Sequence, residues 1–464
     1  MESINPATGV RIASYPEHEP AAIDALLDRA VAAYRDWRLR SFADRGRLMA
    51  AVAAVLRAHV SEFSELMTLE MGKPIAAAES EVEKCAVTCE HFARYAERYL
   101  AAEDIASDAA HSFVRYDPLG VVLAVMPWNF PFWQAIRCAA PALMAGNVVV
   151  LKHASNVPGS ALALERVFAE AGFPAGAFTS LLIPGSQVDP LIRDPRIAGV
   201  SVTGSEATGA SVASVAGAAL KKCVLELGGS DPFIVLSDAD VDAVAVEAAA
   251  ARTINNGESC IAAKRFIVAE PVADAFLDRF TDAMRRLVVG DPLDRATQIG
   301  PLARPDLVDA LERQVGDSVR MGAQLTAGGK RLERPGSYFP PTVLANVEPG
   351  MPVFDEETFG PVAAVIRSRD ERHAIALANL SRYGLGASIW TADAARGERL
   401  AADIEAGCVF VNGAVKSDAR LPFGGVKASG WGRELSAAGI REFTNVKTVW
   451  RADARHATQP GRAE

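Results

Sequence analysis

The chain has 464 residues and a net charge of -9 at pH 7, and 50% of its residues are hydrophobic while 23% are charged. A chain of this length exceeds one ordinary hydrophobic core, so we expect two or three domains. The acidic balance, with no Lys/Arg-rich block, argues against nucleic acid or an anionic membrane as the main partner. It leaves room for an anionic small molecule in a local cationic pocket.

The cysteine pattern and the absence of targeting signals indicate a cytoplasmic protein. Six cysteines are few for this length, and they include no Cys-x-x-Cys pair, so neither zinc nor a disulfide framework is expected. Residues 1–6 lack the basic and apolar regions of a signal peptide. Residues 118–136 carry no charge, but their prolines and amides suit a buried strand and a turn rather than a membrane helix.

The N-terminal hundred residues show helical periodicity. Apolar side chains from Ile23 to Trp37 recur at helical spacing, and amphipathic stretches follow at about 44–70 and 76–101. Gly72 and Pro74 separate the last two stretches. We therefore expect this region to be mostly helical.

From residue 121 onward, short apolar runs bounded by Gly or Pro alternate with helical segments. Continuous apolar strands separated by helices predict a parallel sheet covered on both faces, an architecture that dinucleotide-binding domains share with many other proteins. The predicted strands are 121–125, 148–151, 178–182 and 199–202, and the predicted helices include 160–171 and 208–219.

A second α/β series begins near residue 232, after a glycine-containing break at 225–232. Residues 443–450 alternate like an edge strand that could pair with another subunit, and the last dozen residues have the composition of a disordered tail. The predicted strands of this series are 233–236, 266–268, 362–366, 387–390 and 408–411, and its predicted helices are 240–252 and 272–288.

Cys260 lies where a small polar, glycine-containing turn meets a predicted strand. Substrate can approach a thiol in such a place, and the thiol pKa can be depressed there, which exposes the nucleophilic thiolate. A lone cysteine is more often a buried small hydrophobe. Other segments must therefore decide between these interpretations.

Asn129 lies between aromatic residues and prolines directly after a buried strand, in the run Met-Pro-Trp-Asn-Phe-Pro-Phe-Trp at 126–133. Ligands bind at the carboxyl edge of strands in open α/β sheets. A rigid amide donor at that edge suits an oxyanion site. The alternative is a proline-aromatic corner that only packs.

Two further segments suit a phosphorylated cofactor. Lys152 ends a predicted strand and precedes a small polar segment, which fits contact with a ribose hydroxyl or a phosphate, although a solvated lysine is the alternative. Residues 202–209 form a Gly-rich turn into a helix, where backbone N–H groups can hold a pyrophosphate. The spacing is not the G-x-G-x-x-G fingerprint, so a standard Rossmann motif is not predicted.

Glu226 lies in the break between the two α/β units. Desolvation in such a cleft raises the pKa of a carboxyl group, which can then act as a general base. A salt bridge at the end of a strand is the alternative role.

Several motifs occur in a fixed order, and together they resemble the aldehyde dehydrogenase superfamily over essentially the whole chain. Residues 223–233 and 260–266 are similar to the short bacterial succinate-semialdehyde dehydrogenases of that superfamily. The motifs are Pro-Trp-Asn-Phe-Pro at 127–131, Leu-Glu-Leu-Gly-Gly at 225–229, Gly-Glu-Ser-Cys at 257–260, Glu-Thr-Phe-Gly-Pro at 357–361 and Pro-Phe-Gly-Gly-Val-Lys-Ala-Ser-Gly at 422–430.

The resemblance implies an α/β fold of the aldehyde dehydrogenase type. Residues 1–99 and 119–226 would form a Rossmann-type dinucleotide-binding domain, and residues 227–428 an α/β catalytic domain. Residues 100–118 and 429–464 would form a small β oligomerisation element and the C-terminal tail. The assembly expected from this element is a homodimer or a dimer of dimers.

The resemblance also assigns roles to individual residues. Cys260 would be the nucleophile and Glu226 the base, and Asn129 with the backbone N–H of Cys260 would form the oxyanion hole. Within the cofactor site, Lys152 would contact the adenine ribose and Glu357 the nicotinamide ribose. The cofactor-binding residues expected are Trp128, Lys152, Ser155, Gly204, Ser205, Leu227, Glu357 and Phe359.

Ser155 predicts that NADP is accepted and preferred, with NAD also possible. Many NAD-preferring family members carry a glutamate three residues after the lysine, and this chain has Ser155 there. A glutamate would repel a 2′-phosphate, whereas a serine hydroxyl can donate to it and Lys152 can pair with it.

The predicted substrate is a short carboxylated aldehyde, succinate semialdehyde. In the succinate-semialdehyde dehydrogenases that the chain resembles, an arginine eight residues after the asparagine meets the substrate carboxylate, and this chain has Arg137 there. This spacing is just over two helical turns, so Asn129 and Arg137 can face one pocket, in which we also place Trp133. A guanidinium binds a carboxylate in bidentate fashion. The alternative is that Arg137 makes a structural bridge.

Other functions remain open at this point. One is a broader or different aldehyde specificity, and another is a CoA-acylating relative, against which the hydrolytic base Glu226 argues. A third is a catalytically silent binding relative, against which the presence of Cys260, Asn129 and Lys152 argues.

Overall fold

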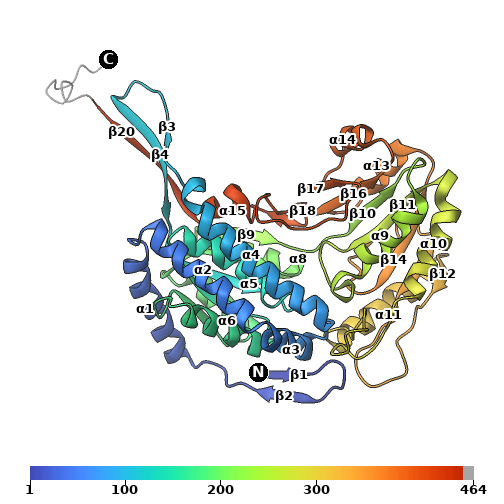
Figure 1. Cartoon of the computed structure of the whole chain (residues 1–464), viewed down its shortest axis with the longest axis horizontal. Coiled ribbons are helices and arrows are strands. Elements are labelled where there is room, and N and C mark those ends of the chain that lie inside the picture. Colours follow the sequence, from blue (N-terminus) through green and yellow to red (C-terminus); the bar gives the residue numbers. More distant parts are fainter. Residues whose placement is uncertain (453–464) are drawn as a thin grey trace.

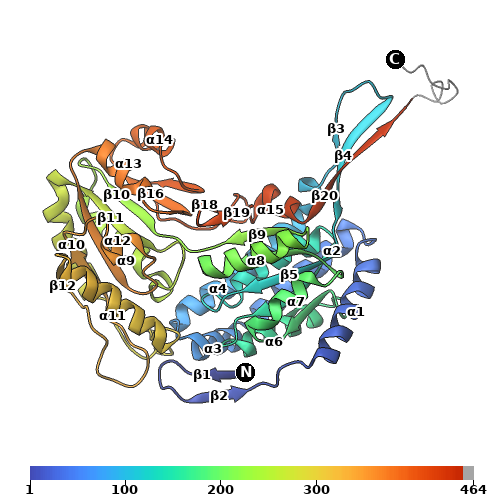
Figure 2. The ribbon, with the colours of Figure 1, turned by 180° about the vertical axis from the view of Figure 1, so that it is seen from behind.

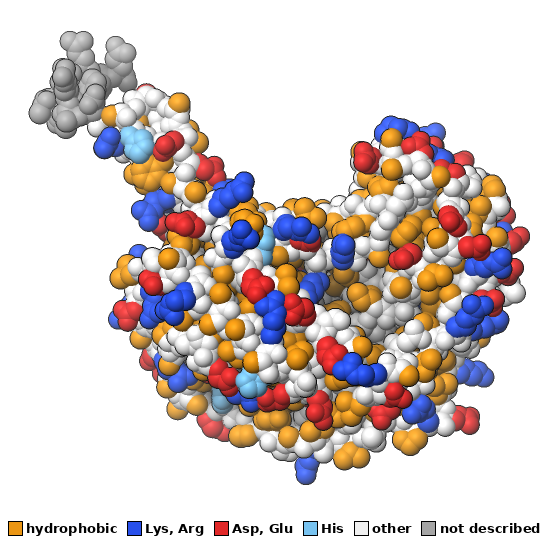
Figure 3. All heavy atoms as spheres, viewed as in Figure 1, with side chains coloured by type: hydrophobic (Ala, Val, Ile, Leu, Met, Phe, Trp, Pro, Cys, Tyr) orange, Lys and Arg blue, Asp and Glu red, His pale blue; other side chains and the backbone are white. Residues whose placement is uncertain are grey.

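A computed structural model describes residues 1–452 of the chain. The predicted α/β class is confirmed: two sheets form two lobes, and a β-ribbon projects from one of them (Figure 1). A hollow separates the lobes on the face shown in Figure 3. Within residues 1–452, no helix combines the length and the apolar character that crossing a bilayer requires.

The N-terminal region is helical, as predicted, and packs within the first lobe. The predicted stretch 44–70 is two helices, because His59 leaves the helical region (φ -112°, ψ 22°) and its ring contacts Glu62 and Glu170. The four helices are α1 (Pro20–Trp37), α2 (Phe42–Ala58), α3 (Val60–Met71) and α4 (Ile75–Tyr99), preceded by the strand pair β1 (Glu2–Ile4) and β2 (Arg11–Ser14).

The first lobe is built on a six-stranded sheet in the order β19-β9-β8-β5-β6-β7. Helices α2 and α4 lie over the face turned to the viewer in Figure 1, and α7 and α8 over the face seen in Figure 2. The parallel strands are β5 (Val121–Met126), β6 (Val148–His153), β7 (Phe178–Leu181), β8 (Ile197–Thr203) and β9 (Lys222–Glu226), with β19 (Gly430–Trp431) antiparallel at the edge. The helices between them are α5 (Trp133–Met144), α6 (Pro158–Glu170), α7 (Val188–Arg193) and α8 (Glu206–Ala218).

The second lobe is built on a seven-stranded sheet in the order β12-β13-β14-β11-β10-β16-β17. Ile234 and Ile267 of its central strands belong to one apolar cluster and Phe233 and Phe266 to another, so both faces are buried, as the continuous apolar runs predicted. Its strands are β10 (Asp231–Val235), β11 (Ala263–Ala269), β12 (Gln324–Ala327), β13 (Thr342–Ala345), β14 (Val362–Ser368), β16 (Gly386–Trp390) and β17 (Cys408–Val411), all parallel except β12. Its helices are α9 (Val241–Thr253), α10 (Ala273–Arg285), α11 (Pro305–Arg320), α12 (Pro352–Asp355), α13 (Glu371–Asn379) and α14 (Ala394–Ala401).

The projecting ribbon joins two distant parts of the chain. Strand β4 (His111–Pro118) pairs antiparallel with β3 (Glu103–Asp104) and with β20 (Thr444–Arg451), where a strand was predicted at 443–450. The rest of the C-terminal segment differs from the predicted oligomerisation element, because β19 joins the first sheet and α15 (Ser436–Glu442) packs on α4 and α5. The predicted disordered tail lies outside the described residues.

The remaining regular elements are short. Strand β15 (Tyr383–Gly384) pairs with β18 (Val426–Lys427), and 3-10 turns occur at Gly185–Gln187, Ile254–Gly257 and Glu270–Val272. The predicted break at 225–232 contains the end of β9 and the start of β10, with only the four residues between them outside a strand. This short crossing places the end of β9 beside the second lobe (Figure 1).

Candidate active site

A cavity of about 230 Å³ gathers predicted site residues from both lobes. Asn129 reaches it from the loop after β5, and Cys260 from the loop before β11. Loops that follow strands of the first sheet thus face loops of the second. The predicted residues that line the cavity are Trp128, Asn129, Gly204, Ser205, Leu227, Cys260, Glu357 and Phe359.

The loop before Cys260 is shaped by three consecutive residues with positive φ. Asn255 (54°), Asn256 (61°) and Gly257 (78°) adopt the left-handed region, which Asn tolerates better than most residues and Gly adopts freely. A Cβ on Gly257 would lie 2.4 Å from the carbonyl of Gly360. The loop therefore needs a glycine where it packs against the 357–361 motif.

Lys264 fixes the loop around Cys260 through hydrogen bonds to the backbone. Its buried Nζ donates to the carbonyl oxygens of Ser259 (2.9 Å), Cys260 (2.9 Å) and Ala262 (3.1 Å). Lys264 is not among the residues predicted for the site. The signal was available, because Lys264 and Arg265 are two charged residues inside a strand that is otherwise apolar and fully buried.

The side chain of Asn129 is held against the same loop. Its Nδ2 donates to the carbonyl oxygen of Glu258 (3.1 Å), and its Oδ1 has no partner within the described chain. Asn255 ties both backbones together, since its Nδ2 donates to the carbonyl oxygens of Asn129 (2.8 Å) and Glu258 (3.0 Å). One N–H of the Asn129 amide remains available for an oxyanion.

Buried polar groups hold the segment that carries Asn129. Oε1 of Glu81 accepts hydrogen bonds from the backbone N–H groups of Phe132 and Trp133, both at 2.9 Å, where α5 begins. Nε2 of His153 donates to the carbonyl oxygen of Pro131 (2.8 Å), and burial lowers the His153 pKa to about 4. The neutral imidazole and the carboxylate therefore fix the segment from two sides.

The thiol of Cys260 is a protonated group in this environment. Burial raises its pKa to about 12, although the cationic Arg137 and Lys264 act in the opposite direction. The thiol pKa is therefore raised rather than depressed, because the loss of hydration outweighs the nearby positive charges. Formation of the thiolate needs a proton acceptor or a change of surroundings.

Glu226 ends β9 as a buried carboxyl group with no hydrogen-bond partner in residues 1–452. Its residue is 2% exposed, and burial raises its pKa to about 8. The positive charge of Arg137 lowers the Glu226 pKa, while Glu434 raises it. Glu226 also contributes to the electrostatic field at the Cys260 thiol, so its ionisation and that of the thiol are linked.

Arg137 is buried and forms an internal ion pair. Its guanidinium contacts the Glu434 carboxylate, donates to Thr203 Oγ1 (3.2 Å) and lies 4.0 Å from a Glu226 oxygen. The guanidinium also lies over the Phe423 ring at 4.9 Å. These contacts correspond to the structural alternative, so the substrate-binding role of Arg137 stays a prediction.

The motif at 357–361 meets the glycines that follow Glu226. Oε1 of Glu357 accepts a hydrogen bond from the backbone N–H of Gly229 (3.0 Å) and lies 3.7 Å from Lys264 Nζ. A Cβ on Gly228 would lie 2.6 Å from Glu357 Oε2. The ring of Phe359 meets that of Trp128 edge to face at 5.7 Å. Glu357 and Phe359 are thus fixed at one wall of the cavity.

Lys152, Ser155 and the turn at 204–205 lie at the ends of first-sheet strands. Lys152 belongs to β6, is 8% exposed, and has no ion pair or hydrogen bond to another side chain in the described chain. Burial lowers its pKa. Ser155 is exposed, and Ser205 caps α8 by accepting a hydrogen bond from the Thr208 N–H (3.2 Å). An anion at these strand ends would compensate the unpaired ammonium.

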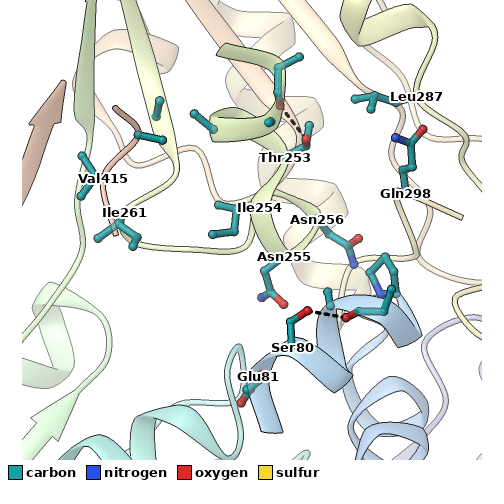
Figure 4. A pocket seen from close by; sticks show the side chains of 18 of the residues that line it. Ser80, Glu81, Thr253, Ile254, Asn255, Asn256, Ile261, Leu287, Gln298 and Val415 are labelled. Carbon is teal, nitrogen blue, oxygen red and sulfur yellow. Dashed lines mark hydrogen bonds between the residues drawn. The ribbon is translucent and has the colours of Figure 1, made fainter. Parts of the chain in front are cut away.

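A larger cleft of about 920 Å³ lies on the other side of the segments that carry Asn129 and Cys260. Phe130 and Ile261, the neighbours of Asn129 and Cys260, line it, as does Trp133, which was predicted to contact substrate. Figure 4 shows Ile261 with Val415 on one side of this cleft and Ser80 of α4 on another. Asn129 and Cys260 therefore lie between a narrow cavity and a wide cleft.

Neither metal ligation nor a disulfide marks the site. Residues 1–452 contain no group of three or more His, Cys, Asp or Glu side chains placed to hold a metal ion, and all six cysteines are free thiols.

Comparison with known proteins places this architecture. Residues 1–449 match the model of the aldehyde dehydrogenase family. The chain belongs to this family. The aldehyde dehydrogenase class predicted from the motifs is thereby confirmed.

Similar relatives carry more specific names. A protein of Synechocystis named a probable NADP(+) succinate-semialdehyde dehydrogenase is 52% identical over 97% of this chain and 99% of its own length. A succinate-semialdehyde dehydrogenase [NADP(+)] of Mycolicibacterium paratuberculosis is 51% identical over 97% of this chain and 96% of its own.

Solved structures share the fold. The succinic semialdehyde dehydrogenase of Streptococcus pyogenes, crystallised with NADP+, superposes with a TM-score of 0.95 at 37% identity, covering 97% of this chain and all of that one. The succinate-semialdehyde dehydrogenase of Burkholderia pseudomallei gives 0.95 at 35% identity, covering 98% of this chain and 94% of that one. The fold is that of the family.

Proposed function

We propose that the protein oxidises succinate semialdehyde to succinate with NADP as the electron acceptor. The observation that carries this proposal is the meeting of Cys260 and Asn129 between a narrow cavity lined by Glu357 and Phe359 and a wide cleft lined by Trp133. The names of relatives about half identical over nearly the full length support this substrate and this cofactor.

The residues around the narrow cavity suit a nicotinamide dinucleotide. Lys152 is a buried cation without a counter-ion in the described chain, and the turn at Gly204 and Ser205 opens α8, whose N-terminus attracts a pyrophosphate. Glu357 would hold the nicotinamide ribose from the opposite lobe. When bound, the nicotinamide supplies the acceptor for the hydride that leaves the aldehyde carbon.

The first chemical task falls to Cys260 and Asn129. The Cys260 thiolate forms a bond to the aldehyde carbon, and the carbonyl electron pair moves to oxygen. The Asn129 amide and the Cys260 backbone N–H stabilise this oxyanion. When the carbonyl re-forms, the hydrogen on that carbon departs with its electron pair, and the substrate is left as a thioester on Cys260.

Glu226 supplies the base for the second half of the reaction. Its ionised carboxylate takes a proton from water, the water oxygen bonds to the thioester carbon, and the carbon–sulfur bond breaks. The acid is released and the Cys260 thiolate is restored. A carboxyl group with a pKa of about 8 can both accept that proton and lose it again near neutral pH.

Steady-state kinetics of the purified protein test the proposal. Succinate semialdehyde should be oxidised with NADP at a kcat/KM well above that of uncharged butanal, and Cys260→Ala should abolish NADPH formation while its circular dichroism stays unchanged. Acyl-CoA that appears only when CoA is added would instead indicate the acylating branch. Absence of NADPH with a broad aldehyde panel would contradict the proposal.

Ser155→Glu tests the cofactor part of the proposal. A carboxylate beside Lys152 would repel the 2′-phosphate and accept hydrogen bonds from ribose hydroxyls. The ratio of kcat/KM for NADP to that for NAD should fall roughly tenfold or more, equivalent to about 1.4 kcal/mol. Ser155→Ala is the control, because it removes the hydroxyl without adding a charge. An unchanged ratio in Ser155→Glu would contradict the role of this position.

We also propose that the protein assembles with further copies of itself and works in the cytoplasm. The ribbon of β4 and β20 projects from the first lobe with Trp450 and Val446 exposed, which suits pairing with a second copy in a homodimer or a dimer of dimers. Six free thiols suit the reducing cytoplasm. Analytical ultracentrifugation before and after Trp450→Glu would test the assembly.

A further inference from the structure

Lys84 is a lysine of α4 whose ammonium group reaches the wide cleft. It lines the cleft together with Trp133, and its Nζ lies 4.2 Å from the centre of the Trp133 ring. Nζ also donates a hydrogen bond to Ser417 Oγ (2.7 Å), in the loop after β17. Three segments distant in the sequence thus hold one cation at the wall of the cleft.

This ammonium group has no carboxylate partner in the described part of the chain. The other cations at the cleft differ, because Arg295 forms an ion pair with Glu79 and Arg286 is exposed to water. Lys84 is partly buried, so it has lost hydration without gaining an opposite charge. Such a group binds a carboxylate more strongly than a hydrated surface lysine does.

We propose that Lys84 binds the carboxylate of the substrate and thereby sets the preference for aldehydes that carry a carboxylate at the far end of a short chain. The inference rests on the proposed function, since it names the residue that recognises this substrate class. Ser417 and Trp133 position the ammonium, the first by a hydrogen bond and the second through the face of its ring.

The position of Lys84 relative to the catalytic residues supports this role. Trp133, which contacts the ammonium, lies four residues after Asn129 at the start of α5. Phe130 and Ile261 line the same cleft directly beside Asn129 and Cys260. The cleft therefore extends from the chain neighbours of Asn129 and Cys260 to the ammonium, which suits a substrate with an aldehyde at one end and a carboxylate at the other.

The charges around Lys84 leave it able to bind an anion at neutral pH. Burial and the nearby Arg137 of α5 lower its pKa to about 8, while Cys85 and Glu81 of α4 and Asp418 of the 412–421 loop act in the opposite direction. A carboxylate bound beside the ammonium would stabilise its charged form.

Lys84→Met tests the inference with two matched substrates, 4-oxobutanoate (succinate semialdehyde) and its methyl ester. The variant keeps an unbranched side chain one atom shorter and removes the charge. The ratio of kcat/KM for the acid to that for the ester should fall at least about tenfold, mainly through KM. Lys84→Arg should restore much of the ratio, and Arg286→Met, which removes an exposed cation at the same cleft, should leave it unchanged.

The outcomes separate this inference from the proposed function. If the wild-type protein does not prefer the acid to the ester, the proposed substrate is wrong. If it does and Lys84→Met retains the ratio, Lys84 does not recognise the carboxylate although the proposed function stands. Should Lys84→Met not fold, as judged by thermal unfolding, Lys84→Gln and Ser417→Ala provide the same ratio, which must fall in the first for the inference to survive.

Discussion

Glu226 and Glu357 are acidic residues near Cys260, and the protein surrounds them differently. Glu357 is bound on its Oε1 side by the Gly229 N–H and faces the Lys264 ammonium at 3.7 Å. Neither oxygen of Glu226 accepts a hydrogen bond within residues 1–452, and its nearest cation, Arg137, is engaged by Glu434. Burial raises the pKa of both carboxyl groups.

The difference suits the two carboxyl groups to different tasks. A carboxylate tied by an N–H and an ammonium keeps one position, which suits holding a ribose. A carboxyl group without hydrogen bonds has oxygens free for water and a pKa near neutrality, which suits proton transfer. The unpaired group is expensive to bury, and this cost indicates function rather than stability.

The largest expected difference between the two groups is kinetic. Glu226→Gln should lower kcat by about 10²–10⁴-fold, because no group then takes the proton from water. Rapid mixing should show a burst of one NADPH per active site followed by slow turnover, since the thioester still forms. Glu357→Gln should lower kcat/KM for the cofactor roughly tenfold without a burst.

The reverse result would contradict the assignment of the base to Glu226. A burst in Glu357→Gln together with full turnover in Glu226→Gln would assign the hydrolytic base to the other carboxylate. Hydroxylamine, which attacks thioesters without a protein base, should restore turnover in Glu226→Gln and serves as the control for an intact Cys260.

Arg137, the cation beside Glu226, provides a second test with a smaller expected effect. Arg137→Met leaves Glu434 buried without its partner, which costs about 3–5 kcal/mol of folding stability when a buried pair is broken. It also removes the charge that lowers the pKa of Glu226. We expect kcat/KM to fall by similar factors, on the order of tenfold, for 4-oxobutanoate and for its methyl ester.

A loss confined to the carboxylated substrate would instead restore the predicted role of Arg137 as a substrate ligand. Arg137→Lys is the matched variant, because it keeps the charge but loses the fork that serves Glu434 and Thr203 together. Steady-state kinetics and thermal unfolding of the two variants, measured side by side, separate loss of charge from loss of geometry.

The sequence predicted the strand–helix order well where one residue type dominated. Continuous apolar runs located β5, β6, β10 and β16 to within a residue or two, because buried parallel strands leave little room for polar side chains. Strand β9 was not predicted, since its apolar core of three residues is flanked by Lys222 and Glu226, and its end falls in the predicted break at 225–232.

The electrostatics of the site could not be predicted in the same way. Motifs identified Cys260, but the pKa of its thiol depends on how completely other segments remove water, and burial raises it. Lys84 precedes Asn129 by nearly fifty residues in the sequence, and Glu434 follows the last strand of the second sheet. No local sequence pattern therefore connected either residue with the site. Glu434 meets Arg137 within the first lobe, and Lys84 meets Ser417 of the loop after β17, so both contacts depend on the tertiary fold.

The smallest effect is thermodynamic and concerns the cost of ionising Glu226. Its pKa in the folded protein, about 8, lies above the ordinary value of 4.5. The protonated form is therefore favoured by folding, and this contribution is complete below about pH 4.5 and is lost as the pH rises through 8. Glu226→Gln keeps a neutral side chain at every pH. Its melting temperature relative to the wild type should therefore increase between pH 6 and pH 9, by a few degrees.

Glu357→Gln removes a carboxylate that has partners, so its relative melting temperature should change less over this interval. If the difference in melting temperature between Glu226→Gln and the wild type stays constant between pH 6 and pH 9, the buried carboxyl group does not titrate in this interval. A pKa of about 8 would then not explain its role as a base.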